Sequence, residues 1–299
     1  MNVVKRNLPF LFMVIALIIF YSILLAAYNN DLINGFVFIG VMLVAFAIIL
    51  IPLIVYRNDR KRVRKLSWIV LILGGILCFE TPLLWYESNT YTASCHAEPI
   101  EAFDNSGIHL MLVTTFEIGY LEDKDLIMEG LQQDNLDIID LHKVTNKIRY
   151  HSKNSEILRW LKIQKDDFTI MRDNVTSYLV AKTDSIDDVL NRNDISGDSV
   201  GLGLALSGLI GEGKLENDLT FGVTGALSAS GDVKAIGMIK EKVLIAAEHA
   251  YPYMIIPSEN AEEANEVKKM HDLKVEIFDV NHIDQAMDLI KKLNEEHAK

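Results

Sequence analysis

The C-terminal half of this chain is organised around two short stretches, GDSVG at residues 197–201 and IGMIKEK at residues 236–242. The first stretch opens a run from Val200 to Ile210 that is apolar or glycine almost throughout. Each glycine weakens a helix by about 1 kcal/mol relative to alanine, so a helix over this run has to be held by burial. The sequence therefore predicts a buried helix with Ser199 at its start.

A serine at the start of a helix has two interpretations. Its hydroxyl can cap the helix, which is the commoner case on local sequence alone. It can also lie beside unpaired N–H groups at the positive end of the helix dipole, a good place to stabilise a developing oxyanion. Both interpretations of Ser199 stay open at this point.

The second stretch leads into a helix predicted from Met238 to His249. Apolar residues recur on one face of this helix, starting with Ile239, and Lys242 lies at the margin of that face. An amine among apolar neighbours loses hydration, which lowers its pKa toward the range of a general base. Periodicity alone makes Lys240 almost as good a candidate for that role.

The rest of the C-terminal part alternates short strands with helices, which indicates an α+β fold. We expect strands at 108–118, 177–181, 219–224, 233–236, 253–257 and 274–280, and helices at 262–271 and 283–293. Residues 124–190 are mostly helical in pattern, with Ser155 as the N-cap of one helix.

The N-terminal part contains three long apolar runs, from Leu8 to Tyr28, from Leu32 to Tyr56 and from Trp68 to Tyr86. About 20 residues of helix cross the hydrocarbon of a bilayer, so each run is long enough to span it. The third run contains Glu80 and Pro82, two residues that argue against a span. For the first run the alternative is a cleaved signal peptide, but its apolar stretch is too long and we expect a retained anchor.

Charge is distributed unevenly along the chain. Up to Leu66 there are eight Lys or Arg and two Asp or Glu, and the remainder has 21 and 39. An acidic C-terminal part repels phosphates, which argues against nucleic-acid binding. The basic residues between Arg57 and Lys65 predict a cytosolic loop. We therefore expect a multi-pass protein of the cell membrane with a cytoplasmic N-terminus and an extracytoplasmic C-terminal domain.

Three parts follow from these patterns. They are a transmembrane anchor at residues 1–87, a tether without periodicity at residues 88–106, and a folded domain at residues 107–299. Cys78 lies in the third apolar run and Cys95 in the tether, so no intrachain disulfide framework is indicated. Cys95 is either a bystander thiol or a partner for another chain.

The two stretches and their surroundings closely resemble the proteolytic domain of Lon proteases. The residues that carry the resemblance are Gly197-Asp198-Ser199-Val200-Gly201, Thr224-Gly225, Gly231, Ile236 to Lys242, Ile255-Ile256-Pro257 and Asn260. The family has a Gly-Pro-Ser-Ala-Gly-like nucleophile motif and a Gly-Gly-x-Lys-Glu-Lys-like helix. The 43 positions from Ser199 to Lys242 suit that spacing.

This resemblance implies a Lon-type α+β fold and a catalytic dyad, with Ser199 as nucleophile and Lys242 as base. Thr224 corresponds to a family threonine near the lysine amine, and Gly197 and Asp198 support the nucleophile. The implied protein is a serine endopeptidase that acts on peptides or proteins and needs no cofactor. The family tends to form rings, so a homo-oligomer is an expectation as well.

Three positions depart from the family pattern. Asp198 stands where proline is common, Ala226 where many members have an acid, and Met238 where the lysine helix has a second glycine. Gly-Asp-Ser is also similar to the membrane-associated archaeal branch of the family. The dyad is intact, so these changes bear on substrate preference and on the tuning of the lysine.

Other kinds of site find less support. None of the eight histidines lies in a nucleophile or base context, and no metal-binding spacing of His and Cys occurs. The run from Gly208 to Leu215 fits the start of a phosphate-binding loop but lacks the hydroxyl for magnesium and follows a helix.

No other segment suggests an ATPase. We therefore expect an ATP-independent endopeptidase, anchored in the lipid bilayer, that cleaves flexible or unfolded chains on the extracytoplasmic side. The alternative is a catalytically silent Lon-like module that binds a partner at the cell surface.

Overall fold

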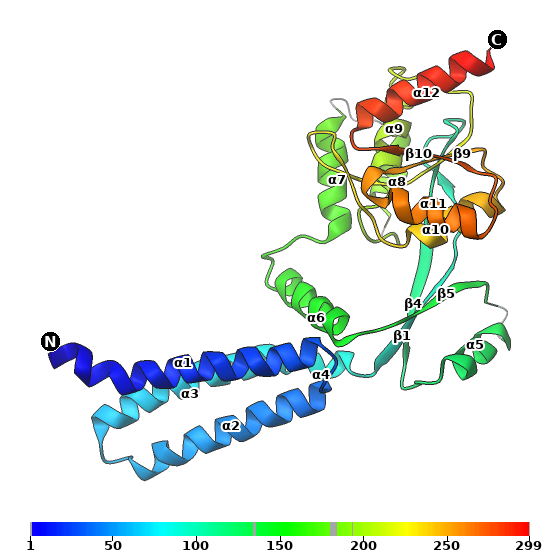
Figure 1. Cartoon of the computed structure of the whole chain (residues 1–299). Helices are drawn as coiled ribbons and strands as arrows, with labels where there is room; N and C mark the ends of the chain where they lie inside the picture. Colours follow the sequence, from blue (N-terminus) through cyan, green and yellow to red (C-terminus); the bar gives the residue numbers. More distant parts are fainter. Residues whose placement is uncertain (1, 134–135, 180–183, 193, 299) are drawn as a thin grey trace. The chain divides into compact units, whose positions relative to one another are not determined.

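The computed structural model describes residues 2–133, 136–179, 184–192 and 194–298. The chain divides into two compact units (Figure 1). The N-terminal unit comprises residues 1–92, 117–124 and 142–161, and the C-terminal unit comprises residues 93–116, 125–141 and 162–299.

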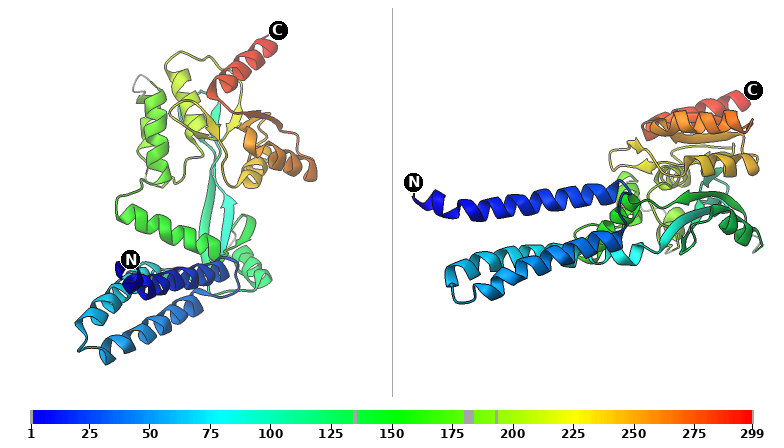
Figure 2. Two further views of the ribbon diagram at one scale, coloured as in Figure 1. Left: turned by 60° about the vertical axis from the view of Figure 1, so that its left-hand side comes forward. Right: turned by 60° about the horizontal axis from the view of Figure 1, so that its bottom comes forward.

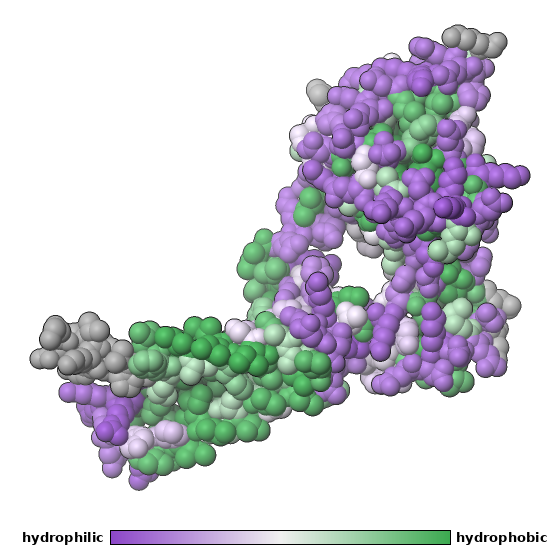
Figure 3. Space-filling view, viewed as in Figure 1, coloured by the Kyte–Doolittle hydropathy of each residue, from purple (hydrophilic) through white to green (hydrophobic). Residues whose placement is uncertain are grey.

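The N-terminal unit contains α1 (Asn2–Asn29), α2 (Gly35–Val55), α3 (Arg60–Glu80), α4 (Leu83–Tyr86) and α6 (Asn146–Trp160). Helices α1, α2 and α3 lie side by side (Figures 1 and 2), and apolar side chains cover most of the surface that they present in Figure 3. The stretches long and apolar enough to cross a membrane are Leu11–Asn29, Gly35–Val55 and Arg60–Tyr86. The three predicted spans are therefore confirmed as helices of membrane-spanning length.

The basic segment between the second and third spans is mostly helical. Helix α3 begins at Arg60, and the carboxylate of Asp59 caps it by accepting hydrogen bonds from the backbone N–H groups of Lys61 and Arg62. The expected basic loop is therefore a short turn followed by the first turns of α3.

Glu80, which weakened the prediction of the third span, is fully buried at the end of α3. Its carboxylate accepts a hydrogen bond from Tyr21 at 2.6 Å and pairs with Lys153 of α6 at 2.6 Å. Pro82 is the N-cap residue of α4. The acid and the proline thus mark the end of the span, and the charge is neutralised within the protein.

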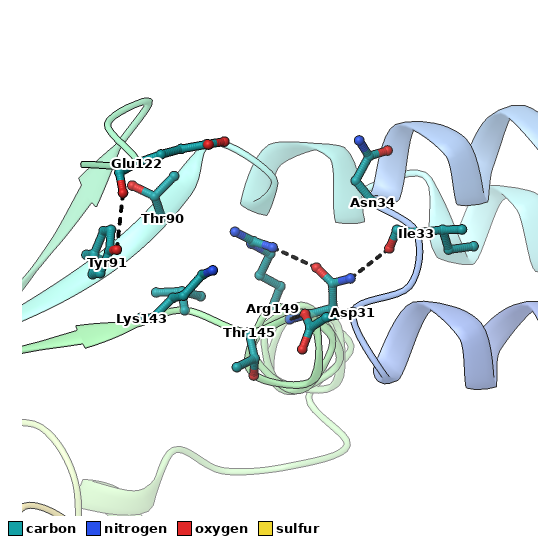
Figure 4. Close-up of a pocket in the computed structure, with 11 residues that line it drawn as sticks. Asp31, Ile33, Asn34, Thr90, Tyr91, Glu122, Lys143, Thr145 and Arg149 are labelled. Carbon is teal, nitrogen blue, oxygen red and sulfur yellow. Dashed lines mark hydrogen bonds between the residues drawn. The ribbon is translucent and has the colours of Figure 1, made fainter. Parts of the chain in front are cut away.

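The start of α6 is fixed to the turn between α1 and α2, beside a cavity of about 470 Å³ (Figure 4). The side chain of Asn146 donates to the carbonyl oxygens of Tyr28 and Ile33, at 2.9 and 2.8 Å. The backbone N–H of Asn146 donates to Asp31 Oδ1 at 2.8 Å, and Arg149 donates to Asn146 Oδ1 at 2.6 Å. Helix α6 is therefore an integral part of the N-terminal unit.

The C-terminal unit is built on a five-stranded sheet with the order β10-β9-β6-β3-β2. These strands are β2 (Ile100–Glu101), β3 (Ile108–Leu110), β6 (Phe221–Val223), β9 (Tyr253–Pro257) and β10 (Glu276–Val280). Strands β3, β6, β9 and β10 run parallel, and β2 pairs antiparallel with β3. A separate hairpin is formed by β7 (Ala226–Leu227) and β8 (Val233–Lys234).

Helices cover both faces of this sheet. They are α7 (Asp167–Tyr178), α8 (Asp184–Leu190), α9 (Gly201–Gly211), α10 (Ile239–Glu248), α11 (Ala261–Met270) and α12 (Ile283–His297). Helices α7, α8, α9 and α12 share one hydrophobic core, and α10 and α11 share another. Strand side chains alternate between the faces, so Ile255 belongs to the first core and Met254 and Ile256 to the second. The expected mixed helix-and-sheet fold is confirmed.

Residues 88–106 are not a tether, and this prediction is wrong. Asn89–His96 form β1, the central strand of a sheet with the order β4-β1-β5, in which β4 is Val113–Gly119 and β5 is Ile138–Lys143. Ala93, Ser94 and Cys95 of β1 are buried. Small polar residues give a weak strand signal, and both partner strands lie far away in the sequence, so local patterning missed β1 and β5.

Two further predictions are corrected within the described residues. The single strand expected at 108–118 is two strands, because the chain leaves the five-stranded sheet after Leu110 and enters the other sheet as β4. Ser155 lies inside α6, whose N-cap is Thr145.

The strand expected at 177–181 is wrong over Ser177 and Tyr178, which end α7, and residues 180–183 lie outside the described part of the chain. Ser177 and Tyr178 continue α7, in which the buried residues Met171 and Val175 recur at the helical period. Helix α5 (Lys124–Gln133) completes the middle segment.

Candidate active site

Ser199 stands just before α9, after a tight turn. Gly197 has φ +82°, in the left-handed region that favours glycine. The N-cap residue of α9 is Val200, and no side chain caps the helix. The interpretation of Ser199 as a simple helix cap is therefore wrong.

The segment that follows β6 is bonded to the Ser199 turn. The N–H of Gly225 donates to the carbonyl oxygen of Ser199 at 2.7 Å, and the N–H of Leu202 donates back to Gly225 at 2.9 Å. The hydroxyl of Thr224 donates to the same Ser199 carbonyl at 3.1 Å. Thr224 is fully buried, so the end of β6 and the start of α9 are held in a fixed relative position.

Lys242 lies on α10 with only 4% of its surface exposed. Its ammonium Nζ donates to Thr224 Oγ1 at 3.1 Å. Burial lowers the pKa of Lys242 to about 8, against smaller opposing effects of the Asp198 and Glu241 carboxylates. A substantial fraction of this lysine is therefore neutral near pH 8, whereas an ordinary lysine is not.

A cleft of about 940 Å³ joins these segments, and both Ser199 and Lys242 line it. Gly197 and Asp198 line the cleft as well. The structure therefore brings Gly197, Asp198, Ser199 and Lys242 together, and Thr224 accepts a hydrogen bond from Lys242. Desolvation raises the pKa of the Asp198 carboxyl above its usual value.

Met238, a departure from the family pattern, also lines the cleft. It is the N-cap residue of α10 and has φ +58°, so it is a non-glycine residue in the left-handed region. That conformation costs an ordinary side chain about 1 kcal/mol or more, which explains the glycine that the family pattern has at this position. Here Met238 takes that conformation in the wall of the cleft.

Strands β1 and β5 hold α10 in place, and the sequence did not reveal this. Ser94 Oγ donates to the buried Glu241 at 3.2 Å, and His96 pairs with Glu248 at 2.6 Å. Lys240 pairs with Asp140. Ser94 and His96 are two positions apart, so they lie on one face of a strand, and this spacing could have indicated that both contact the same helix. The spacing is informative only once the strand itself is recognised.

Within the described residues of the C-terminal unit, one group of side chains has the spacing to hold a metal ion. The ligand atoms of His96, Asp137 and Glu248 lie within 4.8 Å of one another. Asp137 and Glu248 are exposed, and such acidic groups are common without a metal. The expectation of a metal-free site stays a prediction.

Comparison with known proteins locates a family match over this site. Residues 194–292 match the C-terminal proteolytic domain of Lon protease (S16). A Lon protease of Lawsonia intracellularis is 34% identical over 67 residues, and one of Trichlorobacter lovleyi is 36% identical over 67 residues. Each match covers 22% of this chain and 8% of the relative. The resemblance drawn from the two motifs is confirmed: residues 194–292 of this chain are similar to the C-terminal proteolytic domain of Lon protease (S16).

Proposed function

We propose that this chain is a membrane-anchored serine endopeptidase in which Ser199 is the nucleophile and Lys242 is its general base. The observation that carries the proposal is the buried Lys242, whose pKa is lowered to about 8 and whose Nζ is held by Thr224 beside the Ser199 cleft. A neutral amine can accept a proton from a serine hydroxyl without a histidine or an aspartate.

The proposed reaction proceeds through an acyl-enzyme. Neutral Lys242 takes the proton of Ser199 Oγ as this oxygen attacks the carbonyl carbon of the peptide. The resulting ammonium then donates that proton to the leaving amine when the C–N bond breaks. Water attacks the ester with Lys242 again as base, and the acid product leaves as Ser199 recovers its proton.

The start of α9 supplies the groups that stabilise the oxyanion in this proposal. Among the described residues, the backbone N–H groups of Ser199 and Val200 donate to no backbone carbonyl. Both lie at the positive end of the helix dipole, where negative charge is stabilised. Thr224 acts as a positioning residue, because its hydroxyl bonds both Lys242 and the Ser199 carbonyl.

We propose in addition that cleavage is independent of ATP. The only stretch that fits a phosphate-binding loop in the sequence, residues 208–215, contains the end of α9 and a turn with Gly213 at φ +69°. Without an energy source the enzyme cannot supply the 5 to 15 kcal/mol, roughly, that unfolding a domain costs. Its substrates are therefore flexible tails, loops or unfolded chains.

The substrate prediction is tested with a stable folded domain that carries an unstructured tail. We expect the purified full-length protein in lipid vesicles to trim the tail and leave the domain intact, with equal rates with and without ATP. Gel analysis over time, with the Ser199→Ala variant as control, measures both parts. ATP-stimulated degradation of the folded domain would contradict the proposal.

We propose that the C-terminal unit lies on the extracytoplasmic side. The basis is the cluster of basic residues at the start of α3, from Arg60 to Lys65, since basic segments next to a span stay in the cytosol. Protease added to intact spheroplasts is then expected to degrade an epitope after Lys299 and to spare one inserted at Asn58. An epitope after Lys299 that is protected until the membrane is broken would reverse the orientation.

The lowered pKa of Lys242 predicts how the cleavage rate depends on pH. The general base works only when neutral, so kcat/KM for an uncharged peptide is expected to rise with pH with a midpoint near pH 8 and to level off above it. Asp198 stabilises the charged lysine. Asp198→Asn is therefore expected to shift the midpoint of the profile to lower pH. A flat profile from pH 6 to 10 would contradict the role of Lys242 as base.

A further inference from the structure

One face of helix α6 packs on the N-terminal helices along the first part of α6 and is exposed at the C-terminal end of α6. Near its start, Asn146 bonds the turn between α1 and α2. Near its middle, Lys153 pairs with Glu80, and neither side chain is exposed. Trp160 lies seven residues after Lys153 and so on the same face of the helix, yet it is 80% exposed.

The open end of α6 lies beside the spans and not beyond their ends. Helix α6 begins beside the ends of α1 and α4, runs back toward the N-terminal end of α1 and diverges from it, so that its C-terminal turn lies farther from α1 than its first turn does (Figure 1). Leu161, the next residue, is 50% exposed. The end of α6 thus presents an exposed tryptophan and an exposed leucine in the unit that contains the helices of membrane-spanning length.

Other exposed apolar side chains lie at the end of the spans beside which α6 begins. Leu32, between α1 and α2, is 76% exposed, and Trp85 of α4 is 81% exposed. Trp68, near the opposite end of the third span, is 59% exposed. At 1.5 Å per helical residue, the 17 residues from Trp68 to Trp85 cover about 25 Å, close to the roughly 30 Å of the hydrocarbon core. Tryptophan favours both boundaries of that core.

We propose that α6 is an interfacial helix, and that Trp160 and Leu161 are embedded in the bilayer at the boundary between headgroups and acyl chains. We assign lipid to the exposed end of this helix face. The same face of α6 packs on the third span through Lys153 and Glu80, so its exposed end continues a surface that adjoins the membrane-spanning helices. The chain leaves the N-terminal unit at Leu161. The bilayer therefore fixes, at headgroup level, the point from which the chain runs on to α7.

The three tryptophans of the chain allow a direct test. Trp68→Phe with Trp85→Phe leaves Trp160 as the sole tryptophan, whose emission is excited selectively above the absorption of tyrosine, and both replaced side chains are exposed. The full-length protein is reconstituted in phosphatidylcholine vesicles that carry a nitroxide at a shallow or a deep acyl position. The matched control replaces all three tryptophans by phenylalanine and adds Met270→Trp, at a residue of α11 that is 77% exposed.

We expect the shallow nitroxide to quench Trp160 at least about twofold more strongly than the deep one, as for a side chain at the membrane boundary. Aqueous acrylamide should quench Trp160 less than the Met270→Trp reporter, which no lipid nitroxide should quench. Acrylamide quenching equal to that of the reporter, without quenching by lipid, would overturn the proposal. Protection from both quenchers that depends on the protein-to-lipid ratio would assign the face to a second copy of the chain and overturn it as well.

Discussion

Lys242→Arg is expected to lower kcat/KM for peptide cleavage by at least about 10²- to 10⁴-fold, the usual contribution of a general base. Arginine keeps the positive charge but cannot be deprotonated at any working pH, so it cannot take the proton of Ser199. Ser199→Ala is expected to lose at least as much, because the groups of a catalytic unit depend on one another. Initial rates on a fluorogenic peptide measure both effects.

The matched control is the same substitution two residues earlier. Lys240 is partly exposed and pairs with Asp140, and it does not line the cleft. Lys240→Arg preserves that ion pair and should change kcat/KM less than about threefold, in line with the small worth of exposed ion pairs. Equal losses from both substitutions, or full activity of Lys242→Arg, would refute the assignment of the base.

Removal of one partner of the buried pair Glu80–Lys153 is expected to destabilise the N-terminal unit by about 3 to 5 kcal/mol. The nitrogen and oxygen lie 2.6 Å apart with neither side chain exposed, so Lys153→Met leaves an unpaired buried carboxylate. Thermal unfolding of the full-length protein in lipid nanodiscs, followed by protease resistance, measures the loss.

The double variant Glu80→Gln with Lys153→Met should recover most of this loss, because no uncompensated charge remains. The control is Lys165→Met, which breaks an exposed pair with Asp173 and should cost under about 1 kcal/mol. If Lys153→Met were as mild as Lys165→Met, the pair would not hold α6 to the spans.

The parts of the site that could be predicted from sequence are those specified by residues close together in the chain. Ser199 and Lys242 each lie in a local motif with its own helix, and the structure places both at one cleft. The strand Tyr253–Pro257 and the helix from Ile283 were likewise marked by a short apolar pattern. Local period and turn chemistry suffice for such elements.

The parts that could not be predicted depend on pairing across long distances in the chain. Glu80 argued against the third span because a local pattern cannot show its partner Lys153, which lies 73 positions away in the sequence. Ser94 supports Glu241 on the lysine helix from 147 positions away. Neither contact leaves a periodic trace in the sequence, so β1 was missed as a strand and the start of α6 was placed at Ser155 instead of Thr145.

The central claim is that Ser199 is a nucleophile activated by Lys242, and the most direct measurement is the site of acylation. The full-length protein is incubated with a serine-directed acylating reagent at pH 9, and peptide mass spectrometry locates the adduct. We predict stoichiometric modification of Ser199 in the wild type and in Lys240→Arg, and none in Lys242→Arg. An unmodified Ser199 in the wild type would favour a catalytically silent binding module, and modification that is equal in Lys242→Arg would contradict the dyad.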